Sequence, residues 1–292
     1  MSATTAIASP SHTMWVPSPE SELPLLFDSP HSGHVFPADF DTLATPAELA
    51  TAWDAYVEEL WSGVVPVGGS LLAAHFPRVV IDPNRAESDI DPALLAGDWP
   101  TEWGQLQPTA YSERGMGLMR RHILPGRPMY AAPLSVEQVQ WRLASLYRPY
   151  HEALAGRLEA LQTRFGTVWH IDCHSMKSSG NAMNIDNGKA RPDFVLGDLD
   201  GRSCAKAFTD IVATELLKRG YTVSRNDPYK GGYIVQRYHN PAAGRHCLQI
   251  EINRRLYLDE TNQTKTTGFA QLQADLGALS AILADYIRAT VD

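Results

Sequence analysis

The sequence predicts an α/β fold organised around one buried strand. From about residue 24 onward, strand-like and helix-like segments alternate along the chain, as they do in α/β proteins. The run Val168–Met176 begins as an apolar strand, reaches an Asp172-x-His174-Ser175 tip and stops at a polar, glycine-containing loop. Because open α/β sheets bind ligands beyond the carboxyl ends of their strands, His174 is the first candidate metal ligand.

The composition is that of a globular enzyme. The chain has 292 residues, of which 44% are hydrophobic and 20% charged, and its formal net charge is -8. This charge disfavours binding to nucleic acid or to acidic membranes, and no apolar run approaches the roughly 20 residues of a membrane helix. The 3 cysteines are far apart and form no Cys-x-x-Cys pair, which argues against a disulfide scaffold or a thiolate zinc site. We therefore expect a cytoplasmic protein.

The domain organisation is predicted to be simple. Residues 1–22 are rich in Ser, Thr, Ala and Pro and lack the basic start and apolar core of a signal peptide, so we expect a loosely ordered N-terminal arm. Without a linker or an internal repeat in the remainder, residues 23–292 are expected to form a single domain. The oligomeric state is left open.

Two predicted strands in the first half of the chain end in polar residues. Residues 24–27 resemble a short strand, and turn formers around His31 follow it, so this histidine repeats the strand-then-His-Ser arrangement of the central strand. Residues 78–82 resemble a β-branched strand that ends beside Asn84 and Arg85. An arginine fork with a neighbouring amide can hold a carboxylate, although a surface turn would use similar residues.

A helix is predicted between these two strands. Thr45 opens a capping box with proline at the first helical position, and the helical pattern continues to about Trp61. Asp54 lies at the edge of its apolar face, where an acid needs a partner. It is either a boundary residue in a salt bridge or an acidic metal ligand, and Glu58, further toward solvent, is the alternative ligand.

The second half contains a further candidate within a strand. Residues 86–133 lack periodicity and predict a long excursion over the active-site face. The elements predicted after it are a helix over 135–165 that Pro149 kinks or breaks, strands over 193–197, 221–224 and 247–254, and helices over 203–219 and 268–289. In the strand 247–254, Glu251 lies between Ile250 and Ile252. A carboxylate in an apolar strand needs a partner or a role, which makes Glu251 a candidate general base.

These residues fit the chemistry of a metal-dependent hydrolase. Two histidines, one carboxylate and an open position are the usual ligands of catalytic zinc, so His31, Asp54 and His174 would hold the metal and Glu251 would accept a proton from water. Asp172 could instead orient an imidazole. None of the ligand spacings is a compact metal motif, so a metal hydrolase remains one hypothesis among several from the residues alone.

Five short motifs resemble, in their order, those of the N-formylglutamate amidohydrolase family. They are Pro30-His31-Ser32-Gly33, Asp82-x-Asn84-Arg85, Asp172-Cys173-His174-Ser175, Lys230-Gly231-Gly232-Tyr233 and Leu248-Gln249-Ile250-Glu251, spread over residues 24 to 260. The resemblance implies a mixed, mostly parallel sheet flanked by helices, similar to zinc carboxypeptidases and aminoacylases. It also implies one Zn²⁺ per chain and a small anionic substrate.

The resemblance assigns a role to each candidate residue. The metal ligands would be His31, Asp54 and His174, the base Glu251, the substrate α-carboxylate site Asn84 and Arg85, and the weaker candidates for a side-chain carboxylate Arg237 and Arg254. The implied reaction is hydrolysis of an N-acyl amino acid, most simply N-formyl-L-glutamate. The alternatives are a related amidohydrolase or carboxypeptidase with another substrate, and a binding protein without turnover. His34 is an additional histidine that could compete for metal or contact substrate.

Overall fold

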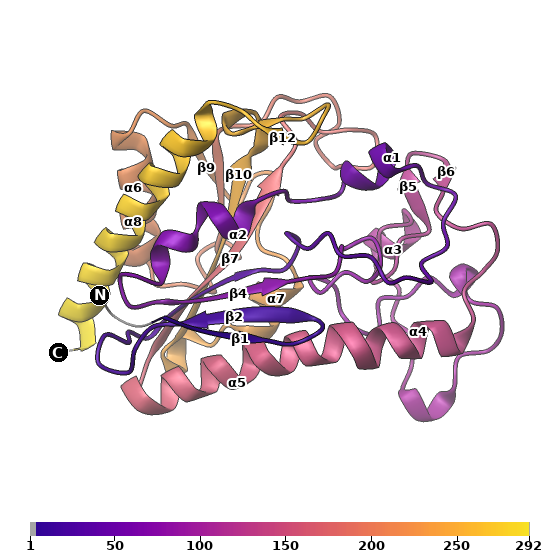
Figure 1. Cartoon of the computed structure of the whole chain (residues 1–292), viewed down its shortest axis with the longest axis horizontal. Helices are drawn as coiled ribbons and strands as arrows, with labels where there is room; N and C mark the ends of the chain where they lie inside the picture. Colours follow the sequence, from indigo (N-terminus) through magenta and orange to yellow (C-terminus); the bar gives the residue numbers. More distant parts are fainter. Residues whose placement is uncertain (1–3, 292) are drawn as a thin grey trace.

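An eight-stranded mixed sheet forms the centre of the molecule in the computed structural model, which describes residues 4–291 (Figure 1). Its strands are β1 (Thr5–Ala8), β2 (His12–Val16), β3 (Leu25–Ser29), β4 (Ser70–Ala74), β7 (Val168–Met176), β8 (Phe194–Gly197), β9 (Val223–Arg225) and β10 (Arg245–Asn253). They lie in the order β1-β2-β4-β3-β7-β10-β8-β9, and the pairs β4–β3, β3–β7, β7–β10 and β8–β9 are parallel. The predicted mixed, mostly parallel sheet is confirmed.

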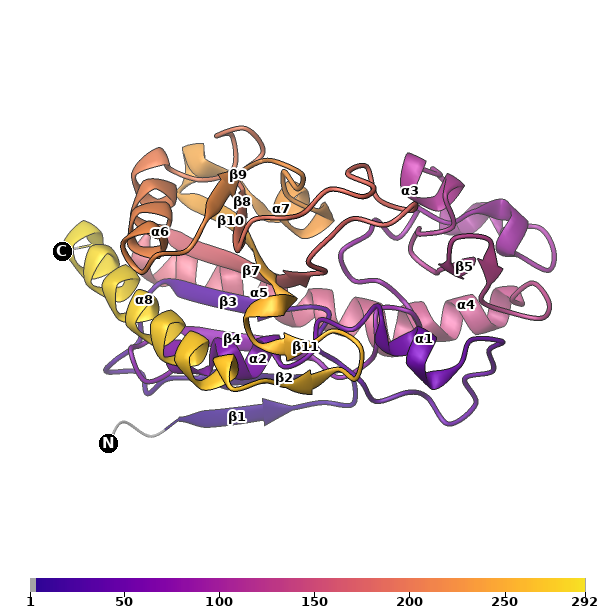
Figure 2. The same ribbon diagram turned by 90° about the horizontal axis from the view of Figure 1, so that it is seen from above.

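Helices cover both faces of this sheet. The α-helices of the described chain are α1 (Pro46–Ala50), α2 (Val57–Leu60), α3 (Ala110–Glu113), α4 (Val136–Arg142), α5 (Arg148–Phe165), α6 (Lys206–Lys218), α7 (Tyr233–Tyr238) and α8 (Gly268–Val291). Apolar side chains of α2, α6 and α8 pack on one face, and those of α4, α5 and α7 pack on the other (Figure 2). Two small hairpins, β5 (His122–Leu124) with β6 (Arg127–Pro128) and β11 (Leu258–Asp259) with β12 (Thr264–Lys265), lie outside the main sheet. No helix within residues 4–291 is both long and apolar enough to span a membrane.

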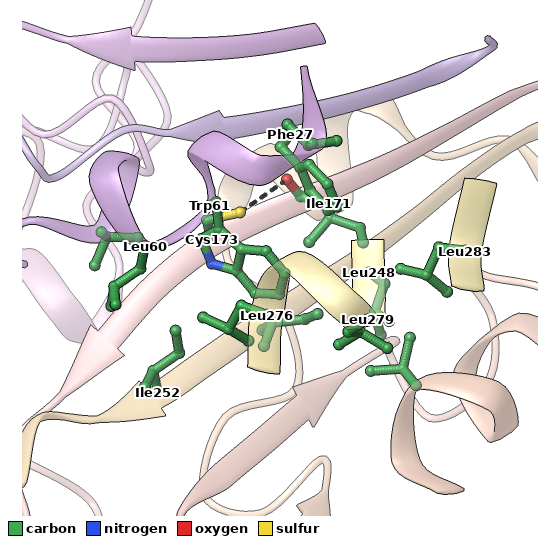
Figure 3. Close-up of a cluster of buried hydrophobic side chains, with 14 of the residues drawn as sticks. Phe27, Leu60, Trp61, Ile171, Cys173, Leu248, Ile252, Leu276, Leu279 and Leu283 are labelled. Carbon is green, nitrogen blue, oxygen red and sulfur yellow. Dashed lines mark hydrogen bonds between the residues drawn. The ribbon is translucent and has the colours of Figure 1, made fainter. Parts of the chain in front are cut away.

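The central strand β7 is buried along its whole length, but its two faces differ in chemistry. Ile171 and Cys173 belong to the apolar cluster that packs under α8 (Figure 3). Because successive side chains of a strand alternate, His170, Asp172 and His174 lie on the opposite face. The strand therefore contributes to the core with one face and carries a row of buried polar groups on the other.

The predicted helix over residues 45–61 is interrupted. It forms α1 and α2, and the chain turns between them, with Tyr56 at a positive φ of 61°. In this turn the Asp54 N–H donates to the His31 carbonyl oxygen at 3.1 Å. The apolar periodicity correctly predicted helical structure in this segment. The interruption between α1 and α2 lets Asp54 face the end of β7.

The predicted strand over residues 78–82 is wrong, because this segment forms turns. Side-chain hydrogen bonds replace the pairing of a strand: Arg78 donates to Asp82 Oδ2 from Nη2 at 2.7 Å, and the Asn84 N–H donates to Asp82 Oδ1 at 2.9 Å. Short polar side chains that bond nearby groups in this way compete with regular secondary structure. The turn brings Asp82 beside His31 instead of leaving it at a strand end.

The helix that Pro149 was predicted to kink or break is irregular near this residue but stays uninterrupted from Val136 to Phe165. A π-helical segment, Leu143–Tyr147, joins α4 to α5, and Pro149 lies in the first turn of α5. Proline cannot donate the backbone hydrogen bond that a continuous helix would need at this position, and the wider π turn accommodates the missing donor.

The N-terminal segment contains regular structure. Residues 1–22 include β1 and β2, and β2 pairs antiparallel with β4, so this part of the predicted arm belongs to the edge of the main sheet. Alternating burial in β2 lets Met14 pack into the core. The division into an arm and a single domain over residues 23–292 stays a prediction.

Candidate active site

The structure brings together three side chains that the sequence singled out. His31 lies in the loop after β3, Asp54 in the turn between α1 and α2, and His174 near the end of β7, and all three are buried. Asp54 Oδ2 is 3.5 Å from His31 Nδ1 and 3.2 Å from His174 Nδ1. One potential ligand atom from each residue lies within 4.8 Å of the others, a spacing that can hold a metal ion. These three side chains are called the His-Asp-His cluster below.

A carboxylate contacts the outer nitrogen of each histidine. His31 Nε2 is 2.7 Å from Asp82 Oδ1, and His174 Nε2 is 2.8 Å from Asp172 Oδ1. A carboxylate at Nε2 favours the tautomer with its proton there, which leaves the Nδ1 lone pair free. The Nδ1 atom of His31 is buried and has no hydrogen-bond partner among the described residues. A cation in the cluster would remove the cost of this unsatisfied atom.

Asp54, rather than Glu58, occupies the acidic position of the cluster. Arg254 Nη2 donates to Asp54 Oδ1 at 2.8 Å, and the Ser175 N–H donates to Oδ2 at 3.1 Å. Burial acts to raise the pKa of Asp54, but the adjacent imidazoles of His174 and His31 and the charge of Arg254 outweigh it and hold that pKa well below its usual value. Asp54 is thus ionised, as a metal ligand must be. Glu58 lies outside the cluster.

Glu251 lies beside the cluster on the neighbouring strand. It is the register partner of His174 between β10 and β7 and is only 8% exposed. Burial raises its pKa to about 7, and the charge of His174 opposes that rise. Gln249 Nε2 donates to Glu251 Oε1 at 2.9 Å and holds the carboxyl group in place. A carboxyl group with a pKa near neutrality can accept and return a proton.

These residues line a cavity of about 690 Å³. The excursion over residues 86–133 contributes to the wall of this cavity, as the sequence predicted. Its lining residues include Tyr111, Met116 and Arg120. Arg78, Arg85 and Lys177 add further positive charges to the lining. A cavity with this lining suits a small anion, although the net charge of the whole chain is negative.

Asn84 and Arg85 both line the cavity, but they differ in whether their polar atoms are available to bind a ligand. Asn84 Oδ1 accepts the Ile234 N–H at 2.8 Å, and Asn84 Nδ2 lies 3.4 Å from Asp172 Oδ2. Gly232 lies so close that an added Cβ would be 2.4 Å from Asn84 Nδ2, which explains the glycine. Arg85 stacks on the Tyr111 ring at 4.0 Å, and its Nη2 has no hydrogen-bond partner within residues 4–291.

The other two arginines that the sequence singled out differ in their access to the cavity. Arg254 lines the cavity, and its guanidinium also bonds Asp54, Ser175 and the Thr51 carbonyl oxygen, so it supports the cluster. Arg237 is not among the residues that line the cavity, because α7 directs its guanidinium onto the rings of Tyr233 and Tyr238. His34 packs against Trp53, with ring centroids 5.2 Å apart, and does not belong to the cluster.

Sequence reasoning missed two features of this site. The role of Asp82 beside His31 was hidden by the prediction of a strand, although the Arg78-x-x-x-Asp82 spacing is also that of an ion pair across one turn. Lys177 is the first residue of the polar loop predicted after residues 168–176. Its position three residues after His174, at the end of β7, was the available signal that it lies at the cavity.

Comparisons with known proteins agree with one another. The family model described as N-formylglutamate amidohydrolase matches residues 23–258. The N-formylglutamate deformylase of Pseudomonas aeruginosa is 31% identical over 243 residues, covering 82% of this chain and 83% of the relative. That of Pseudomonas putida is 32% identical over 251 residues, covering 83% and 84%. The crystal structure of N-formylglutamate amidohydrolase from Ralstonia eutropha JMP134 superposes with a TM-score of 0.92 at 45% identity, covering 97% of this chain and 100% of that one.

Proposed function

The chain belongs to the N-formylglutamate amidohydrolase family, and from this premise we propose that it hydrolyses N-formyl-L-glutamate to formate and L-glutamate. The observation that carries the proposal is the His-Asp-His cluster next to a buried glutamate, at a cavity lined by cations. The cluster supplies the groups for amide hydrolysis, and the cations supply a binding site for a dicarboxylate. The location in the cytoplasm stays a prediction, in keeping with three free, buried cysteines.

His31, Asp54 and His174 would hold one Zn²⁺ per chain. Two imidazole nitrogens and one carboxylate oxygen match the ligand set of catalytic zinc, and the unpaired Nδ1 of His31 supports the assignment. Bound there, Zn²⁺ would polarise the formyl oxygen and lower the pKa of water toward about 7. Asp82 and Asp172 would keep both imidazoles in the orientation that the ion needs.

Glu251 would carry the proton of the reaction. With a pKa of about 7 it can take a proton from the attacking water at neutral pH and deliver it to the leaving amide nitrogen. The hydrogen bond from Gln249 holds Oε1, so the second oxygen, Oε2, would exchange the proton. Gln249 is therefore a positioning residue.

Two arginines have distinct roles in substrate binding. Arg85, with its free Nη2, would bind the α-carboxylate, while Asn84 accepts the Ile234 N–H and so holds the first turn of α7 in place. Arg78 keeps two of its guanidinium nitrogens on Asp82 and lines the cavity. It would stabilise the negative charge that develops on the formyl oxygen, because a fixed, paired arginine needs little reorganisation in the transition state.

The test measures metal content and formate release on the same samples. Elemental analysis of the wild type is expected to give about one zinc per chain, and His174→Ala is expected to lose zinc and activity together. His34→Ala is the matched control, since His34 lies outside the cluster, and it should retain both. Zinc without formate release would redirect the search to other N-acyl amino acids. A wild type that binds no metal would refute the proposed mechanism.

A further inference from the structure

The cavity contains cations that the protein itself does not neutralise. Several of its positive side chains have acidic partners: Arg78 with Asp82 at 2.7 Å, Arg191 with Asp186 at 2.6 Å and Lys230 with Asp200 at 2.9 Å. Arg120 and Lys177 also line the cavity, but neither forms an ion pair with an acidic side chain of residues 4–291. Unpaired, partly buried cations are costly, so their presence in a cavity indicates a ligand that carries negative charge.

Arg120 is the better defined of the two. It follows the turn that begins at Met116, and its Nε atom is buried without a hydrogen-bond partner in the described chain. Burial lowers the pKa of Arg120 to about 9, and the charges of Arg78 and Arg85 act in the same direction. This guanidinium is therefore held close to other cations with its donors unused.

Lys177 approaches from the end of β7. Its Nζ has no hydrogen-bond partner within residues 4–291, and it lines the same cavity as Arg120. Burial lowers the pKa of Lys177 to about 8, with Arg254, Arg120 and Arg191 also lowering it and Glu260 opposing them. The Oε1 atom of Glu260 accepts the Ser178 N–H at 2.8 Å instead of pairing with the lysine.

We infer that Arg120 and Lys177 form the site for the γ-carboxylate of the substrate, separate from Arg85 at the α-carboxylate. The inference rests on the proposed function, because it assumes an N-formyl dicarboxylic amino acid in this cavity. The planar fork of an arginine and the ammonium of a lysine together satisfy both oxygens of one carboxylate. A neutral side chain would leave both cations unpaired, so the pair would select glutamate over neutral amino acids.

The test compares two substrates that differ only in this charge, N-formyl-L-glutamate and its neutral isostere N-formyl-L-glutamine. In the zinc-loaded protein, Arg120→Met and Lys177→Met keep the apolar stem and remove the cation. Each should lower kcat/KM for N-formyl-L-glutamate about 100-fold, as expected for the loss of one partner of a buried charge pair. For N-formyl-L-glutamine, kcat/KM should change by less than about threefold, because the missing charge has no partner in that substrate.

A matched control and a binding measurement separate the possible failures. Arg121→Met removes the neighbouring arginine, which pairs with Asp91 at 2.7 Å and does not line the cavity, and should leave the ratio of the two substrates unchanged. An equal loss for both substrates, or an unchanged ratio in either variant, would overturn the assignment. Calorimetry with L-glutamate and L-glutamine tests the site without turnover. Selective glutamate binding that needs both cations but no formate release would refute the reaction and keep this site.

Discussion

Replacing Asp82 by asparagine tests whether the carboxylate behind His31 prepares the metal site. In the wild type, Asp82 Oδ1 lies 2.7 Å from His31 Nε2, and Oδ2 accepts from Arg78 at 2.7 Å. The amide keeps the shape and an oxygen for His31, but it loses the charge that favours the metal-binding tautomer. Loss of such an orienting partner lowers metal affinity about 10- to 100-fold, which is about 1.4–2.7 kcal/mol.

A competition titration with a chromophoric chelator measures this effect directly. The free energy of unfolding should also fall by about 1–3 kcal/mol, because the largely buried Arg78 loses its charged partner. Urea denaturation of the metal-free protein measures this loss of stability separately from the loss of metal affinity. Asp285→Asn is the control: it removes a carboxylate from an ion pair with Arg288 at 2.7 Å, but its side chain is 75% exposed. Metal affinity of Asp82→Asn within twofold of the wild type would refute the orienting role.

Three further predictions concern the base, the pH profile and the core. Glu251→Gln should lower kcat by at least about 100-fold and leave the zinc content unchanged, so loss of zinc in that variant would contradict its role as base alone. Below the pKa of Glu251, kcat should fall about tenfold per pH unit, because the base must be deprotonated. Burial raises this pKa to about 7, and a bound cation would lower it. A kcat that rises as the pH falls would contradict the role of Glu251 as the base. Leu279→Ala, on the buried face of α8, should lower the free energy of unfolding in urea by about 2–5 kcal/mol, whereas Leu217→Ala, 56% exposed, should lower it much less.

Local sequence patterns were sufficient to predict a site residue wherever a polar side chain lies at the end of an apolar strand. The strands around residues 25–29, 168–176 and 245–253 were visible in the sequence because apolar side chains at alternate positions of each run pack into the core. A charged or imidazole side chain at or near the end of such a run stands out, which is why His31, His174 and Glu251 could be named in advance. The helices α6 and α8 were predictable for the corresponding reason, since their apolar stripes follow the helical period.

Contacts between distant residues decided the rest of the site. Asp54 and Glu58 have similar chemistry and neighbouring positions, and only the interruption between α1 and α2, which Arg254 and Ser175 stabilise, selects Asp54. The same arginine was predicted to bind substrate and does line the cavity, but only the tertiary structure shows its bonds to residues about 80 to 200 positions away in the chain.

What the sequence determined by itself was the α/β class, the order of the main elements and the side chains able to perform metal-dependent hydrolysis. These depend on hydrophobic periodicity and on residue chemistry, which are properties of short segments. Only the tertiary structure decided which carboxylate completes the His-Asp-His cluster, which arginines are consumed by internal pairs and which cations remain free in the cavity. The physical reason is that the charge state and orientation of a buried group depend on its spatial neighbours, and these come from segments far apart in the chain.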